Sequence, residues 1–556
     1  PFVVLEAGLR AFDVGKPTSQ TDPLAGFNRQ HPLFERFGDV YRTVRSRGPY
    51  FGMQEFAAHK PANGFRIFTF GGSTVFGHPY LNDTAFPKWL ELELAVRNPS
   101  RRVESVNCGG VSYASYRLAP IVREVLQYQP DLIVLAMGHN EFLEDRTCNS
   151  LKRRSGFLRW IEEKSFSLRI ATCARQIVAR FGSKTPAARG EESSSSELSP
   201  EVKTRLDDSR TGYASYHRDD AWHAQVVSQF EETFCAMMDE CRTAKVPMLV
   251  VTLGSSLRDC PPFKSEHKPV ITPYEERRWQ SAFDAATEAE ATNLDAALAL
   301  YGKAEAIDDQ HALLLYRMGR CFDRLGQLDR AREYFLRAKD EDVCPLRMPE
   351  RIYELEHSIA AKAGTPLVDA RKLLESHSPD GIPGCDIYLD HVHPTVGAHQ
   401  WIAQAIAARL GELRWFPETT PVSADSRRAA YHRHLESLPP SYFTNGRRRV
   451  EWLENWARRQ KLYDETLPKD ARGFLHQGFR QFDFDDEDAA WKSFQMAIGK
   501  DSGTARQLAR HALELLDQGR PESARNLINR LNQLVSEPAL EKEIHNVASA
   551  LERFGK

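Results

Sequence analysis

The sequence lacks closely spaced cysteines, an excess of one charge and long apolar runs. Its nine cysteines in 556 residues include no C-x-x-C pair, which argues against a zinc ribbon, a thioredoxin-like motif and a complete disulfide framework, although one or two disulfides stay open. The 74 Lys and Arg nearly offset the 76 Asp and Glu, so we expect no nucleic-acid partner. No apolar stretch approaches the roughly 20 residues that cross a bilayer.

The composition is otherwise that of a globular protein, with 41% hydrophobic and 27% charged residues. The chain opens with the short apolar stretch PFVVLEAGLRAF. It reads either as the end of a removed signal or membrane-anchor helix or as a helix that packs on the protein. We favour the first reading, which predicts an extracytoplasmic, periplasmic location.

Apolar strands alternate with amphipathic helices along much of the chain. The unbroken apolar run of residues 131–138 is typical of a strand buried on both faces. The segments that carry this pattern are strands at 65–70, 102–108, 131–138, 247–254 and 365–370, and helices at 86–98, 115–130, 223–246 and 395–410. This alternation predicts an α/β fold with a doubly wound, flavodoxin-like parallel sheet.

A second pattern has a period of 34 residues. Residues of similar type recur 34 positions apart in two segments: Ala297, Tyr301 and Ala304 precede Ala331, Phe335 and Ala338, and Gly478, Ala490, Phe494 and Ala497 precede Ala512, Ala524, Ile528 and Leu531. In both segments the glycine, Gly319 or Gly478, lies at the same offset before the Ala, Phe and Ala positions. A 34-residue period with small residues where helices touch is the tetratricopeptide signature, although a generic helical hairpin stays open. Such repeats commonly bind a protein or peptide, so we expect a partner of that kind.

These patterns divide the chain into five segments. The segment 1–60 is expected to be an irregular wrap, and 183–202 a flexible polar loop. The expected divisions are the wrap at 1–60, the first part of the α/β domain at 61–270, inserted helical repeats at 271–347, the second part of the α/β domain at 348–416, and C-terminal helical repeats at 417–556.

Four short blocks follow predicted strands or precede the last helix of the α/β domain: FGGST (70–74), VNCGGVSYAS (106–115), MGHNE (137–141) and DHVH (390–393). In open parallel sheets, ligands bind at the carboxyl ends of the strands. A serine hydroxyl is a weak nucleophile that needs a base, and a histidine held by a carboxylate supplies one near neutral pH. Ser73, His393 and Asp390 are therefore candidates for nucleophile, base and orienting acid.

Each assignment has an alternative from the sequence alone. Ser73 could cap a helix, and the asparagine of the third block, Asn140, could belong to a turn. His391, His393, Asp390 and His399 could bind a metal ion. We expect catalysis rather than these alternatives, with no metal and no cofactor.

In their order and residues the blocks resemble the SGNH/GDSL hydrolase superfamily, with GGST in place of GDSL. The resemblance implies an oxyanion hole built from the Ser73 N–H, the Asn140 side chain and a backbone N–H of the second block. That block has Ser112 where the family has glycine, so Ser112 and Gly110 both stay open as the donor.

Other polar residues beside these blocks are candidates for substrate binding. They are Glu141 and His139 in the third block, and Arg258 with Lys264 after the strand at 247–254. Structural roles are the alternative for each.

The resemblance implies a serine esterase that hydrolyses an O-acyl ester, with a small acyl group on a glycan as the expected substrate. An O-acyltransferase that uses the same three residues is one alternative. A repeat-based scaffold with a degenerate hydrolase domain is the other.

Overall fold

The computed structural model describes residues 32–143, 213–459, 470–483, 486–534 and 538–554. Its centre is a five-stranded sheet in the order β5–β4–β6–β7–β8, in which all paired neighbours are parallel. The strands are β4 (Gly64–Gly71), β5 (Arg102–Gly109), β6 (Leu132–Ala136), β7 (Met248–Thr252) and β8 (Leu367–Asp369). This 2-1-3-4-5 arrangement is the flavodoxin-like order, and the predicted parallel sheet is confirmed.

The three interior strands are buried along their whole length. All eight residues of β4, all five of β6 and all five of β7 are buried, as the unbroken apolar run of β6 predicts. Arg66 is the charged exception in β4. Its guanidinium is satisfied by the Glu104 carboxylate, 2.7 Å away, and by the carbonyl oxygens of Tyr128 and Ala57, which makes its burial tolerable.

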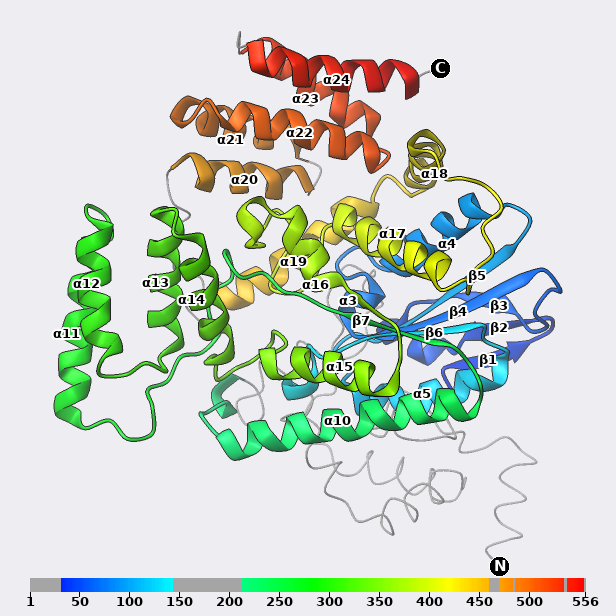
Figure 1. The fold of residues 1–556 in the computed structure, drawn as a ribbon, viewed down its shortest axis with the longest axis horizontal. Helices are drawn as coiled ribbons and strands as arrows, with labels where there is room; N and C mark the ends of the chain where they lie inside the picture. Colours follow the sequence, from blue (N-terminus) through cyan, green and yellow to red (C-terminus); the bar gives the residue numbers. More distant parts are fainter. Residues whose placement is uncertain (1–31, 144–212, 460–469, 484–485, 535–537, 555–556) are drawn as a thin grey trace, which may run out of the picture.

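Helices cover both faces of the sheet (Figure 1). One face carries α4 (Phe86–Arg97), α16 (Ala370–His377) and α17 (Val396–Glu412), and the other α5 (Ser115–Val125), α10 (Asp220–Thr243) and α15 (Glu350–Ala363). Each layer has its own apolar cluster against the sheet. The strand ends between these layers are therefore open to carry a site.

The chain before β4 is more regular than expected. It contains a small antiparallel sheet of β1 (Phe34–Phe37), β2 (Val40–Thr43) and β3 (Glu55–Ala57). The one-turn helix α2 (Gly48–Phe51) lies between β2 and β3 in the chain. The Phe56 ring packs on the Phe68 ring of β4 at 5.4 Å. Strands of three or four residues are too short for alternation to reveal them. Short 3₁₀ turns lie at Arg45–Arg47, Asn82–Thr84, Leu126–Tyr128, Tyr213–Ser215 and Pro379–Gly381.

Of the five helices between β7 and β8 in the chain, the first four form the left side of the molecule in Figure 1. They are α11 (Pro273–Ala289), α12 (Leu294–Glu305), α13 (Ala312–Arg324) and α14 (Leu328–Asp340). A Cβ at Gly319 would lie 2.9 Å from the Phe335 ring, so glycine permits the close approach of α13 and α14. Ion pairs between Arg258 and Asp323 (3.0 Å) and between Arg332 and Glu375 (2.7 Å) join these helices to the α/β layers.

The C-terminal part of the chain is helical and lies over the α4–α17 layer (Figure 1). Its helices are α18 (Ala424–Glu436), α19 (Tyr442–Arg459), α20 (Ala471–Asp483), α21 (Glu487–Lys500), α22 (Thr504–Asp517), α23 (Pro521–Asn532) and α24 (Pro538–Phe554). A Cβ at Gly478 would lie 2.3 Å from the Phe494 ring, which repeats the Gly319–Phe335 contact. The assignment of either helical segment to the tetratricopeptide class stays a prediction.

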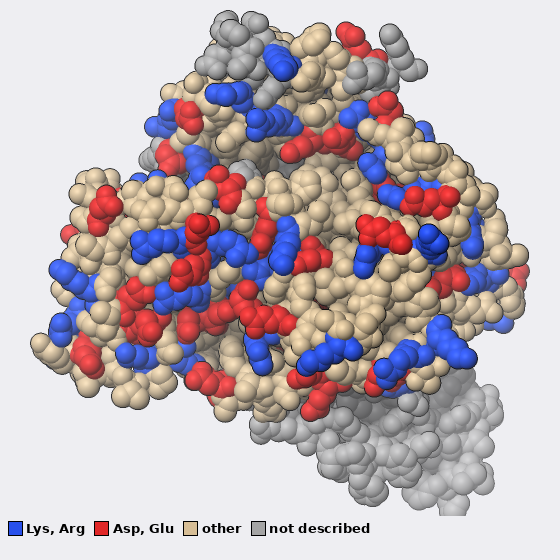
Figure 2. Space-filling model, viewed as in Figure 1, with Lys and Arg blue, Asp and Glu red and all other residues tan. Residues whose placement is uncertain are grey.

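Positive and negative side chains are interspersed on the face shown in Figure 2. The seven cysteines in the described ranges are free thiols. Among the helices described, none is long and apolar enough to cross a membrane. The N-terminal apolar stretch and the polar loop at 183–202 lie outside the described residues.

Candidate active site

Ser73 lies just past the carboxyl end of the interior strand β4, as the first residue of the short helix α3 (Ser73–Phe76). The turn before it needs glycine at both positions. A Cβ at Gly71 would lie 2.0 Å from a backbone carbonyl oxygen of β6, and one at Gly72 would lie 2.3 Å from Asn140 Nδ2. The glycines thus allow β4, β6 and the Asn140 side chain to meet beside Ser73, whose side chain stays half-buried.

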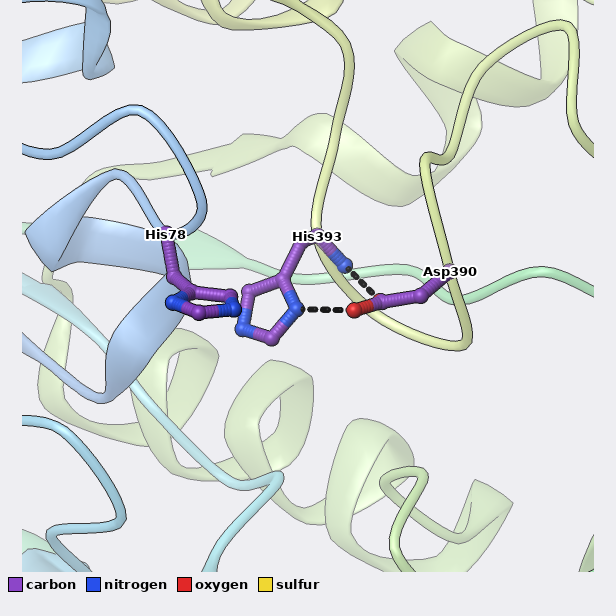
Figure 3. Close-up of side chains that lie close together, drawn as sticks. All are labelled: His78, Asp390 and His393. Atoms are coloured by element: carbon purple, nitrogen blue, oxygen red, sulfur yellow. Dashed lines mark hydrogen bonds and ion pairs between the residues drawn. The ribbon is translucent and has the colours of Figure 1, made fainter. Parts of the chain in front are cut away.

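Asp390 and His393 lie on a tight loop before α17. The loop is closed by a hydrogen bond from the Leu389 N–H to the His393 carbonyl oxygen at 2.8 Å. Asp390 Oδ1 accepts the N–H groups of Val392 and His393, each at 2.9 Å, and Oδ2 lies 2.6 Å from His393 Nδ1. Figure 3 shows the carboxylate facing the imidazole. The short D-x-x-H spacing thus fixes the carboxylate and the ring in one turn.

The structure brings this loop to Ser73. Ser73 Oγ lies 2.7 Å from His393 Nε2, although 320 positions separate the two residues. The neighbouring Thr74 hydroxyl donates to the Val392 carbonyl oxygen at 3.3 Å, which holds the α3 turn against the loop. Ser73, His393 and Asp390 therefore form a continuous hydrogen-bonded chain.

Burial and nearby charged groups set the protonation states of Asp390 and of its neighbour His391. Burial alone would raise the pKa of Asp390, but the imidazoles of His393 and His391 and the hydrogen bonds to its carboxylate hold that pKa well below its usual range. Asp390 is therefore an anion at any pH where the protein would work. Burial lowers the pKa of His391 to about 4, so this second imidazole stays neutral near pH 7.

His78 is a neighbour whose contact with His393 the sequence does not reveal. The two rings lie 4.5 Å apart between centroids, at an angle of 56°. Figure 3 shows them side by side. Burial, and then the nearby His393, lowers the pKa of His78 well below its ordinary value. A neutral ring here packs against the base without adding a positive charge that would oppose its protonation.

The third and second blocks supply the candidate oxyanion donors besides the Ser73 N–H. Asn140 Nδ2 donates to the Tyr113 carbonyl oxygen at 3.2 Å, which points its amide across the Ser73 turn. In the second block, the Gly110 N–H already donates to the Gly71 carbonyl oxygen at 2.9 Å. Ser112 has a left-handed backbone, with φ 61°, the conformation that glycine adopts most easily. We therefore carry forward Ser112, rather than Gly110, as the donor of this block.

Three of the substrate-binding candidates are engaged with other residues. Glu141 accepts the N–H and the hydroxyl of Ser115 at 2.8 and 2.9 Å, which caps α5. Arg258 is buried in its ion pair with Asp323. Lys264 Nζ bonds the carbonyl oxygen of Tyr216.

His139 is buried beside the site and accepts the Met348 N–H through Nδ1 at 3.1 Å. Burial, and then the nearby His391 and His393, lowers its pKa to about 3. The ring is therefore neutral, and its Nδ1 is occupied as an acceptor. The Met348 contact fixes its tautomer, with the proton on Nε2.

The sequence offers His391, His393, Asp390 and His399 as an alternative metal site, but the structure groups different residues at this loop. Among the described residues, the donor group at this loop consists of His78, Asp390 and His393. His391 and His399 do not join it, and His399 Nδ1 instead accepts the Phe86 N–H at 3.3 Å. Both oxygens of Asp390 are already engaged by the loop and by His393.

Comparisons with known proteins give only loose likenesses. No protein-family model matches the sequence, and no curated protein sequence matches it. The chain is similar to the structure of a catalytic mutant of an acetylxylan esterase from Geobacillus stearothermophilus, at 11% identity over 65% of this chain and 100% of that chain, with a TM-score of 0.27. It is also similar to an alpha/beta hydrolase from the metagenome of Lake Arreo, Spain, at 15% identity over 64% of this chain and 97% of that chain, with a TM-score of 0.23. Likeness at this level carries no weight for function.

Proposed function

We propose that the protein is a serine hydrolase that cleaves an O-acyl ester, with Ser73 as nucleophile, His393 as general base and Asp390 as its orienting acid. The observation that carries the proposal is the chain Ser73 Oγ–His393 Nε2 at 2.7 Å and His393 Nδ1–Asp390 Oδ2 at 2.6 Å. A serine, an imidazole and an ionised carboxylate in this order activate a hydroxyl for acyl transfer.

The first half-reaction transfers the acyl group to the protein. Ser73 Oγ attacks the ester carbonyl carbon while its proton passes to His393 Nε2. Asp390, which accepts a hydrogen bond from the Nδ1–H group, stabilises the imidazolium. The tetrahedral intermediate collapses, the bond to the alcohol breaks, and His393 returns its proton to the departing oxygen. A water molecule activated by His393 then attacks the acyl-serine and releases the acid.

The charge that develops on the carbonyl oxygen needs fixed donors. The Ser73 N–H is at the first position of α3, where the helix supplies no partner for it. The amide of Asn140 lies beside the same turn, and the Ser112 N–H is the third candidate. Each such donor typically contributes about 3 kcal/mol to lowering the barrier.

The substrate class rests on the resemblance of the four blocks to SGNH/GDSL hydrolases. We propose a short acyl group, such as acetyl, on a hydroxyl of a glycan. Product distribution separates hydrolysis from acyl transfer, because a hydrolase forms free acid in water alone, whereas a transferase needs an added hydroxyl acceptor.

Ester hydrolysis by purified full-length protein tests the proposal. Acetyl and butyryl p-nitrophenyl esters and an acetylated xylan are compared for wild type, Ser73→Ala and the control Ser376→Ala, an exposed serine on α16. We expect turnover by wild type and Ser376→Ala, and a loss of about 10⁴-fold or more for Ser73→Ala. Equal turnover by all three proteins would reject Ser73 as nucleophile, and no turnover by any would favour the scaffold alternative.

A further inference from the structure

Three metal-ligating side chains from distant parts of the chain meet away from Ser73. Asp259 follows β7, Cys385 precedes the Asp390–His393 loop, and His476 belongs to α20. A carboxylate oxygen, the cysteine Sγ and an imidazole nitrogen all lie within 4.8 Å of one another. His476 is buried and the other two residues are half-buried. The group therefore joins the α/β layers to the C-terminal helices.

The separation of His476 and Asp259 is longer than an ordinary charged hydrogen bond. His476 Nδ1 lies 3.2 Å from Asp259 Oδ2 and 3.3 Å from Oδ1. A bond between an imidazolium and a carboxylate is normally about 2.7–2.9 Å long. Two ligands in a tetrahedral site with bonds of about 2.0 Å are about 3.3 Å apart. The observed spacing suits two ligands of one ion.

The backbone around Cys385 aims the carboxylate into this group. The Cys385 N–H donates to Asp259 Oδ2 at 2.8 Å. The preceding residue must be Gly384, because a Cβ there would lie 2.0 Å from the same oxygen. Cys385 Sγ lies 3.6 Å from the His476 carbonyl oxygen, which places the thiol against α20. A hydrogen bond from outside the donor set thus orients the carboxylate, as in established metal sites.

We propose that Asp259, Cys385 and His476 bind one Zn²⁺ ion. Oxygen, sulfur and nitrogen donors of these types are those that zinc takes, and a thiolate disfavours Mg²⁺ and Ca²⁺. Three protein ligands leave the fourth position of a tetrahedron to water. The adjacent Asp386 is not a ligand in this proposal, because its oxygens accept the Ser378 hydroxyl at 2.6 Å and the Gly384 N–H at 2.8 Å.

Zinc takes its ligands in their deprotonated forms, here a thiolate, a carboxylate and a neutral imidazole, so binding releases the protons that the free ligands hold.

The nearby cation Arg258 is already paired with Asp323, at 3.0 Å. On α20, Arg472 lies one turn before His476 and pairs with Asp323 at 2.8 Å and Asp380 at 2.6 Å. An ion bound by His476 would therefore add a third link from the same face of α20. One ligand of that ion, Cys385, lies five residues before Asp390. The ion would fasten α20 to the segment that carries the proposed base.

Titration of metal-free, reduced full-length protein with Co²⁺ tests the site. Cobalt is the probe because a Co²⁺–thiolate bond gives a charge-transfer band in the near ultraviolet, and four-coordinate Co²⁺ gives strong visible absorption. We expect one equivalent bound with the spectrum of a single thiolate, displaced by one equivalent of Zn²⁺. Cys385→Ser should abolish the thiolate band. His476→Asn should raise the dissociation constant at least about tenfold.

A matched cysteine variant separates this site from binding to other thiols. Cys235→Ser replaces a half-buried cysteine on α10 and should bind Co²⁺ as wild type does. Zn²⁺ at 100 times its dissociation constant should also raise the melting temperature of wild type and Cys235→Ser by a few degrees, but not that of Cys385→Ser. Binding of less than about 0.2 equivalents by wild type, or an undiminished thiolate band in Cys385→Ser, would overturn the proposal. The wild-type result stands even if a variant fails to fold, and neither result depends on esterase activity.

Discussion

The side-chain amide of Asn140 lies against the backbone of Gly72, so close that a Cβ at residue 72 would be 2.3 Å from Nδ2. The glycine before the proposed nucleophile therefore serves a second residue, because it makes room for the amide that would hold the oxyanion. This contact links the first and third sequence blocks directly.

Gly72→Ala should displace the Asn140 amide and leave Ser73 and His393 in place. We expect kcat for a small ester to fall about 10²–10³-fold, as it does when one oxyanion donor is lost. Asn140→Ala should give a similar loss, and the double variant should be little worse than either single one, because both changes remove the same donor.

A glycine elsewhere provides the control for these variants. Gly302 lies within α12 and has open space where a Cβ would sit. Gly302→Ala should keep full activity and stabilise the helix by about 0.5–1 kcal/mol. If Gly72→Ala also retained full activity, the amide of Asn140 would not be the donor.

Ser112 should act through its backbone N–H and not through its hydroxyl. Ser112→Gly keeps the N–H and suits the φ of 61°, so activity within about threefold of wild type and equal or higher melting temperature are expected. Ser112→Ala also keeps the N–H and should stay active, with a stability cost of at most about 1 kcal/mol from the change. A loss of 10²-fold or more in both variants would instead assign the donor to the hydroxyl.

Asp390→Asn tests the orienting role of the carboxylate. The asparagine oxygen can still accept the loop N–H groups, but its NH₂ would face His393 Nδ1. That nitrogen must then accept a hydrogen bond from the NH₂ and carry no proton of its own, so the ring proton is on Nε2, which cannot take one from Ser73. We expect kcat to fall about 10⁴-fold with KM nearly unchanged. A variant with near-normal kcat would show that Asp390 does not fix the tautomer.

Acid should destabilise the protein, because buried histidines that are neutral in the native state take up protons when the chain unfolds. The contribution of one of them, His399, can be measured by substitution. Burial, and then the nearby His393, lowers its pKa to about 3, from an ordinary value of 6.5. Between these values the unfolded chain binds a proton that the native protein does not, so stability is lost as pH falls from about 6.5 towards 3. Thermal unfolding at pH 7 and pH 5 should show a smaller loss for His399→Gln than for wild type.

The expected difference between wild type and His399→Gln follows from the proton that the unfolded chain binds. One such histidine lowers the free energy of unfolding by about 1.4 kcal/mol for each unit of pH decrease between its unfolded and native pKa values. Glutamine can still accept the Phe86 N–H, so the variant should retain most of its stability at pH 7. Equal losses on acidification in both proteins would mean that His399 is protonated in the native state.

The sequence was enough to predict the parallel sheet and the strand ends that carry the four blocks. Apolar runs such as residues 131–136 can be satisfied only as buried strands, so local pattern and tertiary burial agree there. The D-x-x-H spacing predicts one loop because the two residues are only three apart. The approach of Ser73 to His393 needed the resemblance to a known family, since 320 positions separate them.

The remaining features depend on contacts that leave no local signal. The strands β1 to β3 are too short for periodicity to show, and the wrap expected over residues 1–60 contains this small sheet instead. Glu141 and Arg258 are substrate-binding candidates because they follow strands, and the bonds that they make to Ser115 and Asp323 have no signal in the sequence. The Asp259–Cys385–His476 group spans 217 positions between its ends, and its residues have no motif spacing.

Covalent labelling of Ser73 tests the central claim most directly. Full-length wild type, Ser73→Ala, His393→Ala and the control Ser376→Ala are treated with a fluorophosphonate, and the adduct is located by mass spectrometry of peptides. We predict one adduct on Ser73 in wild type and Ser376→Ala, none in Ser73→Ala, and a rate lowered at least about 10³-fold in His393→Ala. Labelling that avoids Ser73, or that proceeds at the wild-type rate without His393, would contradict the account.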